Sequence, residues 1–286
     1  MTTVTVPRVR RLPALADRRT RALCTVGVMA AVLLTVLVAG TMLAHQSSIT
    51  DLSARNQSPS LSHPFGTDRL GRDMFHRTLA GLRLSLLVGT LAAGISAVIA
   101  LILGALAGGR GGKFDAAVAW AIDLVMAMPH LVLLILLAFV LGGGLKAVVI
   151  GVAVTHWPSL TRVLRGEARR VAASDYVAVS RRLGHGGGWV ARHHMVPHLL
   201  PQFSVGMILL FPHAILHEAA LSFVGLGLSP HEPAIGILLA DSMRYLSTGA
   251  WWLAVLPGLA LLLVVKTIDV LGQQLRLLTD PRSVHG

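Results

Sequence analysis

Three histidines in apolar surroundings are the side chains of this sequence whose type and spacing could do chemistry. His156, His213 and His217 lie in or near strongly hydrophobic segments, and the whole chain has thirteen histidines. Residues four positions apart share one face of a helix, so His213 and His217 are expected to point together into a cavity. Ionisable groups inside a membrane are costly and usually face a pathway, and neutral imidazole binds nickel and similar metals well. We therefore predict that these histidines line a membrane pathway and are its candidate metal ligands.

A second interpretation of the same histidines stays open. Interior histidines can be satisfied by hydrogen bonds to the backbone or to a neighbouring acid such as Glu218. Glu218 follows His217 directly and is itself a candidate pathway residue. Met126 and Met128 flank Pro129, where they either pack in the core or give the pathway a soft lining.

Four further residues within apolar segments bear on how the helices pack. Asp123 and Asp269 fall at the depth of predicted spans. Each could pair with an arginine or with Lys266 across helices, or cap a kinked segment, and the sequence leaves these alternatives open. Gly104 and Gly108 are four residues apart, which indicates close helix packing, and packing within the chain is favoured over dimerisation.

The sequence lacks the residue patterns of several enzyme classes. A phosphate-binding loop needs a glycine five residues before its Gly-Lys pair and a hydroxyl residue after it, but Ala107 and Phe114 stand at these positions. A zinc-protease motif begins at His217 and fails at Leu221, where a second histidine is required. The Gly-x-Ser-x-Gly pattern of serine hydrolases does not occur. We predict that the chain is not an enzyme, holds no cofactor and takes its energy from a partner.

Composition and charge indicate a membrane protein. Hydrophobic residues make up 54% of the 286 residues and charged residues only 13%, and long apolar stretches are the decisive departure from globular composition. The net charge of +12 could suggest nucleic acid, but the arginines lie at the ends of apolar segments, as positive-inside topology requires. No nucleic-acid partner is therefore expected. The single cysteine, Cys24, allows no disulfide within the chain. No cleaved signal peptide is predicted, because the arginine-rich residues 1–21 lead into an apolar run of span length.

Six apolar segments predict an all-α membrane protein with six transmembrane helices. Residues 1–21 form a predicted cytoplasmic tail and residues 22–286 the transmembrane domain, with an external loop at 45–77 and a cytoplasmic coupling segment at 165–198. On this scheme 17 lysines and arginines lie inside and 7 outside, so both termini are predicted to be cytoplasmic. The predicted spans are residues 22–44, 84–107, 116–141 with a break at Pro129, 146–161, 199–224 and 251–271, with an outer loop at 225–249.

A basic, polar segment from Glu167 to Pro201 separates two of these spans and is expected to face the cytoplasm. Ser174 can cap a short helix that ends at Gly184, because glycine supplies the left-handed turn. A short amphipathic helix on the membrane surface suits docking onto a soluble partner. The candidate coupling residues are Asp175, Tyr176, Ala178, Val179, Ser180, Arg181, Arg182, Leu183 and Gly184.

The basic segment resembles the cytoplasmic-loop motif of binding-protein-dependent ABC importer permeases, in which Glu-Ala-Ala is followed by three residues and then glycine. The motif falls on Ala178, Val179 and Ser180 and keeps Gly184, so Ala178 replaces the glutamate, which puts one polar contact to the ATPase in question. Other stretches are similar to the second permease of the dipeptide, oligopeptide and nickel group, and the likeness covers about 220 residues. These stretches are HPFGTDRLGRD at His63–Asp73, HEAALSFVGLGLSP at His217–Pro230, Gly258 in LPGLAL, Pro197 and Pro201, and the terminal Asp280–Arg282.

The resemblance implies a type I ABC importer permease fold in the cell membrane of a prokaryote, with no catalytic residue in this chain. It also implies a homologous sister permease, two cytoplasmic ATPase subunits that bind ATP and Mg, an extracytoplasmic solute-binding protein and contact with membrane lipid. Thr155–Trp157 and Leu216–His217 look similar to the nickel-importing permease, so nickel or a metal chelate is the favoured cargo. Import of di- or oligopeptides by the same machinery is the alternative. An intramembrane enzyme and a proton-coupled carrier are more distant ones.

Overall fold

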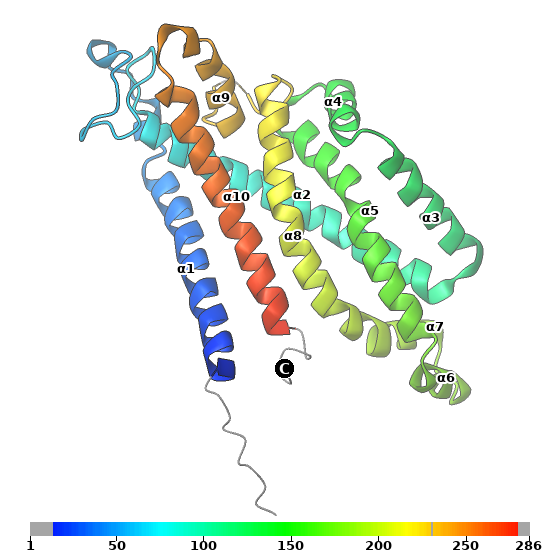
Figure 1. Cartoon of the computed structure of the whole chain (residues 1–286). Coiled ribbons are helices and arrows are strands. Elements are labelled where there is room, and N and C mark those ends of the chain that lie inside the picture. Colours follow the sequence, from blue (N-terminus) through cyan, green and yellow to red (C-terminus); the bar gives the residue numbers. More distant parts are fainter. Residues whose placement is uncertain (1–13, 230, 280–286) are drawn as a thin grey trace, which may run out of the picture.

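The computed structural model describes residues 14–229 and 231–279, and this part of the chain is built from helices (Figure 1). Residues 1–13 of the predicted tail, Pro230 and the Asp280–Arg282 motif lie outside the described residues. The only β pairing within them is one bridge between Thr67 and Asp73. The α-helices are α1 (Ala14–Met42), α2 (Met74–Arg110), α3 (Gly112–Ala127), α4 (His130–Val140), α5 (Gly144–Ala172), α6 (Asp175–Arg182), α7 (Gly187–Val190), α8 (Val196–Phe223), α9 (Ile235–Met243) and α10 (Trp252–Thr279). The short turns are the 3-10 helices η1 (Gln46–Ser48), η2 (Leu52–Ala54) and η4 (Leu246–Thr248) and the π-helical η3 (Ala191–Met195).

By length and composition, five continuous helices of the described chain could cross a membrane, and a sixth span results if the bent pair α3–α4 counts as one. A hydrocarbon core of about 30 Å needs about 20 apolar residues in a helix, and these five helices range from 23 to 37 residues. The predicted all-α membrane fold with six helical segments is therefore confirmed. The five continuous spans are 20–42, α2, α5, 187–223 (α7, η3 and α8 together) and 252–278.

The third predicted span is sharply broken at Pro129. Helices α3 and α4 meet there at an angle of 95°. Met128 adopts an extended conformation (φ −88°, ψ 141°), because the residue before a proline is disfavoured in the helical region. The predicted break is confirmed. The angle turns α4 across the end of the molecule that also carries α9 (Figure 1).

Several helices run beyond the apolar windows that predicted them. Helix α2 covers residues 74–110 and α5 covers 144–172, whereas the predicted spans were 84–107 and 146–161. The coupling segment predicted at 165–198 therefore begins inside α5 and ends inside α8. Hydropathy marks the apolar part of a helix and not its end, and a basic stretch such as Arg169–Arg170 still has good helix propensity. The outer loop predicted at 225–249 also contains a helix, α9, in its middle.

Helix α2 crosses the molecule diagonally and packs closely against α5 (Figure 1). A Cβ atom at Gly104 would lie 2.8 Å from the Cβ of Leu164, and one at Gly108 would lie 2.5 Å from the Cβ of Ala168. Glycine at these two positions lets the helix backbones approach closely. The predicted packing role of Gly104 and Gly108 within the chain is confirmed.

The HPFGTDRLGRD stretch builds the outer start of α2. The carboxylate of Asp73 accepts hydrogen bonds from the amides of Phe75 (2.8 Å) and His76 (3.0 Å) and pairs with His63 Nδ1 at 2.7 Å. This satisfies amides at the helix start that have no partner within the helix. Asp68 binds Arg77 Nη1 at 2.6 Å, so both acids of the motif fix the loop to α2.

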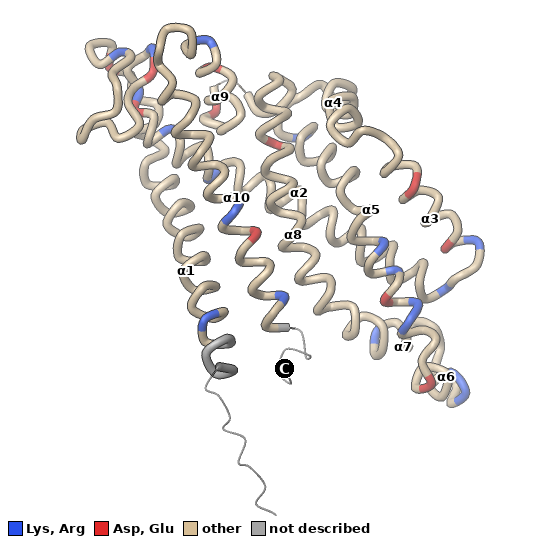
Figure 2. The backbone as a smooth tube through the Cα atoms, viewed as in Figure 1, with Lys and Arg blue, Asp and Glu red and all other residues tan. Residues whose placement is uncertain are grey.

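The acids at span depth pair in two different ways. Asp123 of α3 bonds to Arg162 of α5 at 3.0 Å, across helices, and Asp269 bonds to Lys266 of its own helix at 2.9 Å. The open question about these residues is thus answered by pairing in both cases. Figure 2 shows that charged residues gather at the two ends of the molecule and that few interrupt the helices between them.

The two ends of the molecule carry different structural elements. The start of α1, the end of α10 and helix α6 lie at one end, and the 43–73 loop, α4 and α9 lie at the other (Figure 1). Both termini of the described chain are therefore on the same side, as an even number of spans requires. The end that carries α6 is called the coupling end below, and the opposite end is called the outer end.

Candidate functional site

A cavity of about 580 Å³ opens between α5 and α8 beside the α3–α4 break. Its lining is mostly apolar, with polar groups that come chiefly from histidines and hydroxyl residues. This combination of an apolar wall and a few convergent polar groups is typical of small-molecule sites. The lining residues are Met126, His130, Thr155, His156, Pro158, Ser159, Leu160, Val163, Gly206, Leu209, Leu210, His213 and His217.

Three histidines from three helices converge in this cavity. His130, His156 and His217 each offer a ring nitrogen, and these nitrogens all lie within 4.8 Å of one another. His156 Nε2 is 3.2 Å from His217 Nδ1, and the ring centroids are 4.5 to 4.9 Å apart. Such an arrangement can bind a metal ion, share protons or donate hydrogen bonds to a polar ligand. The set is called the histidine cluster below.

One helix break and two prolines within helices lie close in sequence to the histidine cluster. His130 is the first residue of α4, directly after the break at Pro129. His156 is two residues before Pro158 of α5, and His217 follows Pro212 of α8. A proline inside a helix removes one backbone hydrogen bond and allows a bend, so all three helices carry a proline near the cavity.

The sequence prediction found two members of the cluster and missed the third. His130 was not singled out, although its place next to a proline break inside an apolar run could have indicated it. His213 lines the cavity, but its Nδ1 bonds to the carbonyl oxygen of Leu209 (3.2 Å) and it is not part of the cluster. The prediction that His213 and His217 face one cavity agrees with the structure.

The other candidate pathway residues lie in different places. Met126 lines the cavity, whereas Met128 does not and is 41% exposed. Glu218 is fully buried and is not part of the cavity wall; its Oε1 accepts a hydrogen bond from Ser222 at 2.8 Å. One residue along a helix is a rotation of about 100°, so Glu218 faces the protein interior when His217 faces the cavity.

Helix α6 at the coupling end has the predicted bounds. It runs from Asp175 to Arg182 and is followed by Gly184 with φ +89°, the left-handed turn expected of that glycine. Ser174 occupies the N-cap position but makes no capping bond, because its hydroxyl donates to the carbonyl oxygen of Val171 at 2.6 Å. The capping role expected for the Ser174 side chain is therefore wrong, while the helix start is right.

Most of α6 is exposed. Only Val177 and Ser180 are buried, and Ser180 Oγ lies 2.9 Å from His194 Nε2, which ties α6 to the turn before α8. Tyr176, Val179 and Leu183 are exposed by 42, 54 and 74% and follow one another at helical spacing. The other exposed candidate coupling residues are Asp175, Ala178, Arg181, Arg182 and Gly184.

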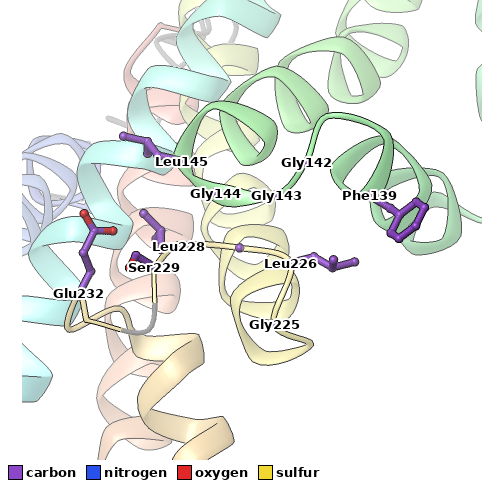
Figure 3. Close-up of a pocket in the computed structure, with 11 residues that line it drawn as sticks. Phe139, Gly142, Gly143, Gly144, Leu145, Gly225, Leu226, Leu228, Ser229 and Glu232 are labelled. Atoms are coloured by element: carbon purple, nitrogen blue, oxygen red, sulfur yellow. The ribbon is translucent and has the colours of Figure 1, made fainter.

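A second hollow of about 630 Å³ lies at the outer end, between the turn before α5 and the segment after α8 (Figure 3). Glycines at 142–144, 225 and 227 line this hollow, so much of its wall is main chain. The amide of Gly144 donates to the carbonyl oxygen of Gly227 at 2.9 Å and joins the two segments. The HEAALSFVGLGLSP stretch therefore connects the histidine cluster at its start to this outer hollow at its end.

These features define a membrane protein with several spans, an inter-helical cavity and an exposed helix at one end, which is the class of the transport permeases. Residues 100–277 match the family described as binding-protein-dependent transport system inner membrane component. The chain belongs to this family. Its members are transporters and not enzymes, and the intramembrane enzyme considered from the sequence is excluded on that ground.

Several relatives are similar over most of the chain. The dipeptide transport system permease protein DppC of Bacillus subtilis is 35% identical over 231 residues, which cover 81% of this chain and 72% of the relative. A protein of Brucella suis, provisionally named a peptide permease, is 37% identical over 254 residues, which cover 88% of this chain and 83% of the relative. A second Brucella suis protein, provisionally named a peptide transport system permease, is 34% identical over 256 residues, or 88% and 86% of the two chains.

The comparisons correct the expectation about the cargo. These relatives are named for peptide transport, so the preference for nickel has no support and the peptide alternative fits better. The preference rested on two short stretches, Thr155–Trp157 and Leu216–His217. The similarity to the relatives named for peptide transport extends over more than 80% of this chain.

Proposed function

We propose that this protein is one permease subunit of a peptide importer that is driven by separate ATPase subunits. The names of its relatives in Bacillus subtilis and Brucella suis support a peptide cargo. The description of its family supports an extracytoplasmic solute-binding protein as a partner. The remaining proposed components are a homologous sister permease and two cytoplasmic ATPase subunits, which hold the ATP and Mg.

The observation that carries this proposal is the exposed apolar face of α6. Tyr176, Val179 and Leu183 present it, and Arg181 and Arg182 lie beside it. Exposed apolar groups rimmed by polar ones mark interaction sites. The face lies at the coupling end together with both termini of the described chain (Figure 1). We assign this end to the cytoplasm and the face to the ATPase subunits.

Helix α6 is linked to both walls of the cavity. Only Ala173 and Ser174 separate it from α5, and α7 and η3 connect it to α8. His156 of α5 and His217 of α8 both line the cavity, and their ring nitrogens Nε2 and Nδ1 are 3.2 Å apart. A movement of α6 is therefore transmitted directly to the two helices that form the cavity wall. ATP binding would draw α6 toward the closing ATPases and open the cavity outward, and hydrolysis would reset it.

Uptake of a radiolabelled dipeptide tests this function. The host strain lacks its own peptide importers and expresses this chain with its sister permease, ATPases and binding protein. Import should require all four kinds of subunit and should stop when the ATPases carry inactivating substitutions. Import that continues without ATPase subunits would identify a proton-coupled carrier, and import of a metal ion without any dipeptide uptake would reject the peptide cargo.

A further inference from the structure

The histidine cluster is a group of metal-binding side chains that the proposed function does not use. His130, His156 and His217 bring three imidazoles together from three helices, and the cavity lining contains no carboxylate. We propose that this cluster binds one divalent transition-metal ion in the cavity, with an open coordination position for a donor group of the transported molecule. The proposal concerns the cargo of the importer inferred above and in that respect depends on the proposed function.

The hydrogen bonds of two rings indicate which of their nitrogens carries the proton. His156 Nδ1 lies 2.9 Å from the carbonyl oxygen of Val152, and His217 Nδ1 lies 2.7 Å from that of His213. A carbonyl oxygen only accepts, so each Nδ1 carries the proton and each Nε2 carries a lone pair. Metal-binding histidines are commonly held in this way, with one ring nitrogen bonded to a backbone carbonyl.

His130 supplies an independent observation. Its Nε2 is buried and has no hydrogen-bond partner in the structure. A buried polar atom without a partner is costly, by about 1–3 kcal/mol in typical proteins, and it calls for a ligand. This nitrogen belongs to the ring that stands 4.5 Å from the His156 ring and 4.6 Å from the His217 ring, measured between centroids.

The spacing of the rings suits a metal of the zinc type. A tetrahedral ion with Zn–N bonds of about 2.0–2.1 Å holds its nitrogens roughly 3.4 Å apart. In the cluster, one nitrogen of each ring lies within 4.8 Å of the other two. The 3.2 Å contact joins His156 Nε2 to the protonated Nδ1 of His217, so it opens when the rings turn their unprotonated nitrogens toward the ion. Imidazole ligands favour zinc, cobalt, copper and related first-row ions over magnesium or calcium.

Three protein ligands leave a fourth position that faces the cavity. The remaining polar lining consists of uncharged groups, such as the hydroxyls of Thr155 and Ser159. A bound dication would lack a negative partner unless the transported molecule supplied one. The carboxylate end of a peptide is such a partner, so the open position suits the carboxylate of a transported peptide.

Cobalt titration of the purified complete transporter tests the site. Co²⁺ should bind with an intense visible absorption band typical of four-coordination. His130→Ala, His156→Ala and His217→Ala should each weaken binding at least about tenfold. His45→Ala, at an exposed outer position, and His213→Ala, in the same cavity but outside the cluster, should leave Co²⁺ affinity unchanged.

Two further measurements keep the outcomes separate. Thermal unfolding identifies any variant that fails to fold, and His130→Ala should be the best tolerated of the three because it lies at the start of a helix. Addition of a dipeptide should change the cobalt spectrum, because its end group enters the open position. Absence of cluster-dependent Co²⁺ binding in a transporter that imports dipeptides overturns the metal site and leaves the proposed function intact. Cluster-dependent binding with no spectral change overturns the contact between the bound ion and the peptide.

Discussion

At the scale of single residues, a close approach of two backbones decides how the outer end is assembled. A Cβ atom at Gly236 of α9 would lie 2.1 Å from the carbonyl oxygen of Ala219 in α8. Ser222, one turn further on, donates to the buried Glu218 and accepts from the amide of Leu228 at 3.2 Å. Gly236 therefore sets the distance between α9 and the helix that carries His217.

Gly236→Ala should destabilise the protein by about 1–3 kcal/mol, because the added methyl group overpacks this contact. Gly27→Ala is the matched control, since nothing lies within 4 Å of a Cβ at that position of α1. The control should be neutral or stabilise by roughly 0.5–1 kcal/mol, the usual gain of alanine over glycine in a helix. Thermal unfolding of the purified complex compares them, and equal midpoints would mean that α9 does not pack on α8 as described.

At the scale of elements, α3 is held to α5 by ion pairs of two aspartates, one buried and one exposed. Asp115 is buried and binds both Arg165 and Arg169. Asp123 binds Arg162, but these two side chains are 73% and 53% exposed. Both acids lie on α3 and all three of their arginine partners lie on α5, so the two acids form a matched pair that differs in burial.

Asp115→Asn should loosen α3 markedly, because breaking a buried ion pair costs about 3–5 kcal/mol when no water replaces the partner. Arg169 is half exposed and reduces the effect to the lower part of that range. Asp123→Asn should cost only about 0–1 kcal/mol, as is usual for exposed pairs. Hydrogen–deuterium exchange of the α3 amides reports the difference, and faster exchange in the Asp123 variant than in the Asp115 variant would contradict this ranking.

The end of α6 offers a second matched pair. Gly184 has φ +89° and Gly186 has φ −70°, and nothing lies within 4 Å of a Cβ at either position. Gly184→Val should distort the helix end, because a β-branched residue is strained by about 1–2 kcal/mol in the left-handed region. Dipeptide uptake should fall while ATP hydrolysis continues. Gly186→Val should retain uptake, and identical behaviour of the two variants would reject a conformational role for Gly184.

The sequence predicted the membrane-spanning helices well, because a span requires a long apolar run and few other structural elements do. Pro129 predicted the break in the third span, and Gly184 predicted the end of α6. Helix ends were harder, since α5 continues through the arginines of the coupling segment to Ala172. Helix α9 was missed because its nine residues are too short for a span and lie in a loop.

The shared position of two cavity histidines could be predicted from local spacing. His213 and His217 are four residues apart and reach one cavity, as a single helix dictates. His130 could not be added by such an argument, because only the 95° break between α3 and α4 and the packing of three helices bring it to His156. Glu218 was predicted beside His217 on the pathway, but it is buried and does not line the cavity, because one residue on a helix changes the face that a side chain occupies.

At the scale of the whole molecule, the proposed function depends on a mechanical link between α6 and the cavity. Helix α6 lies at the coupling end (Figure 1), and α5 and α8 carry His156 and His217 of the histidine cluster. Both helices lead from one to the other, and small residues of α2 pack closely along α5. We therefore infer that α5, α6 and α8 move together when the proposed ATPase subunits at the coupling end move α6.

Cross-linking from a single cysteine tests this central claim most directly. Cys24 is the one cysteine of the chain, so a Cys24→Ser background accepts Val179→Cys on α6 and Leu61→Cys in the outer loop, which are 54% and 105% exposed. In the assembled transporter, Val179→Cys should cross-link to an ATPase subunit and respond to ATP, and Leu61→Cys should not. An ATPase adduct at Leu61→Cys, or none at Val179→Cys, would contradict the account.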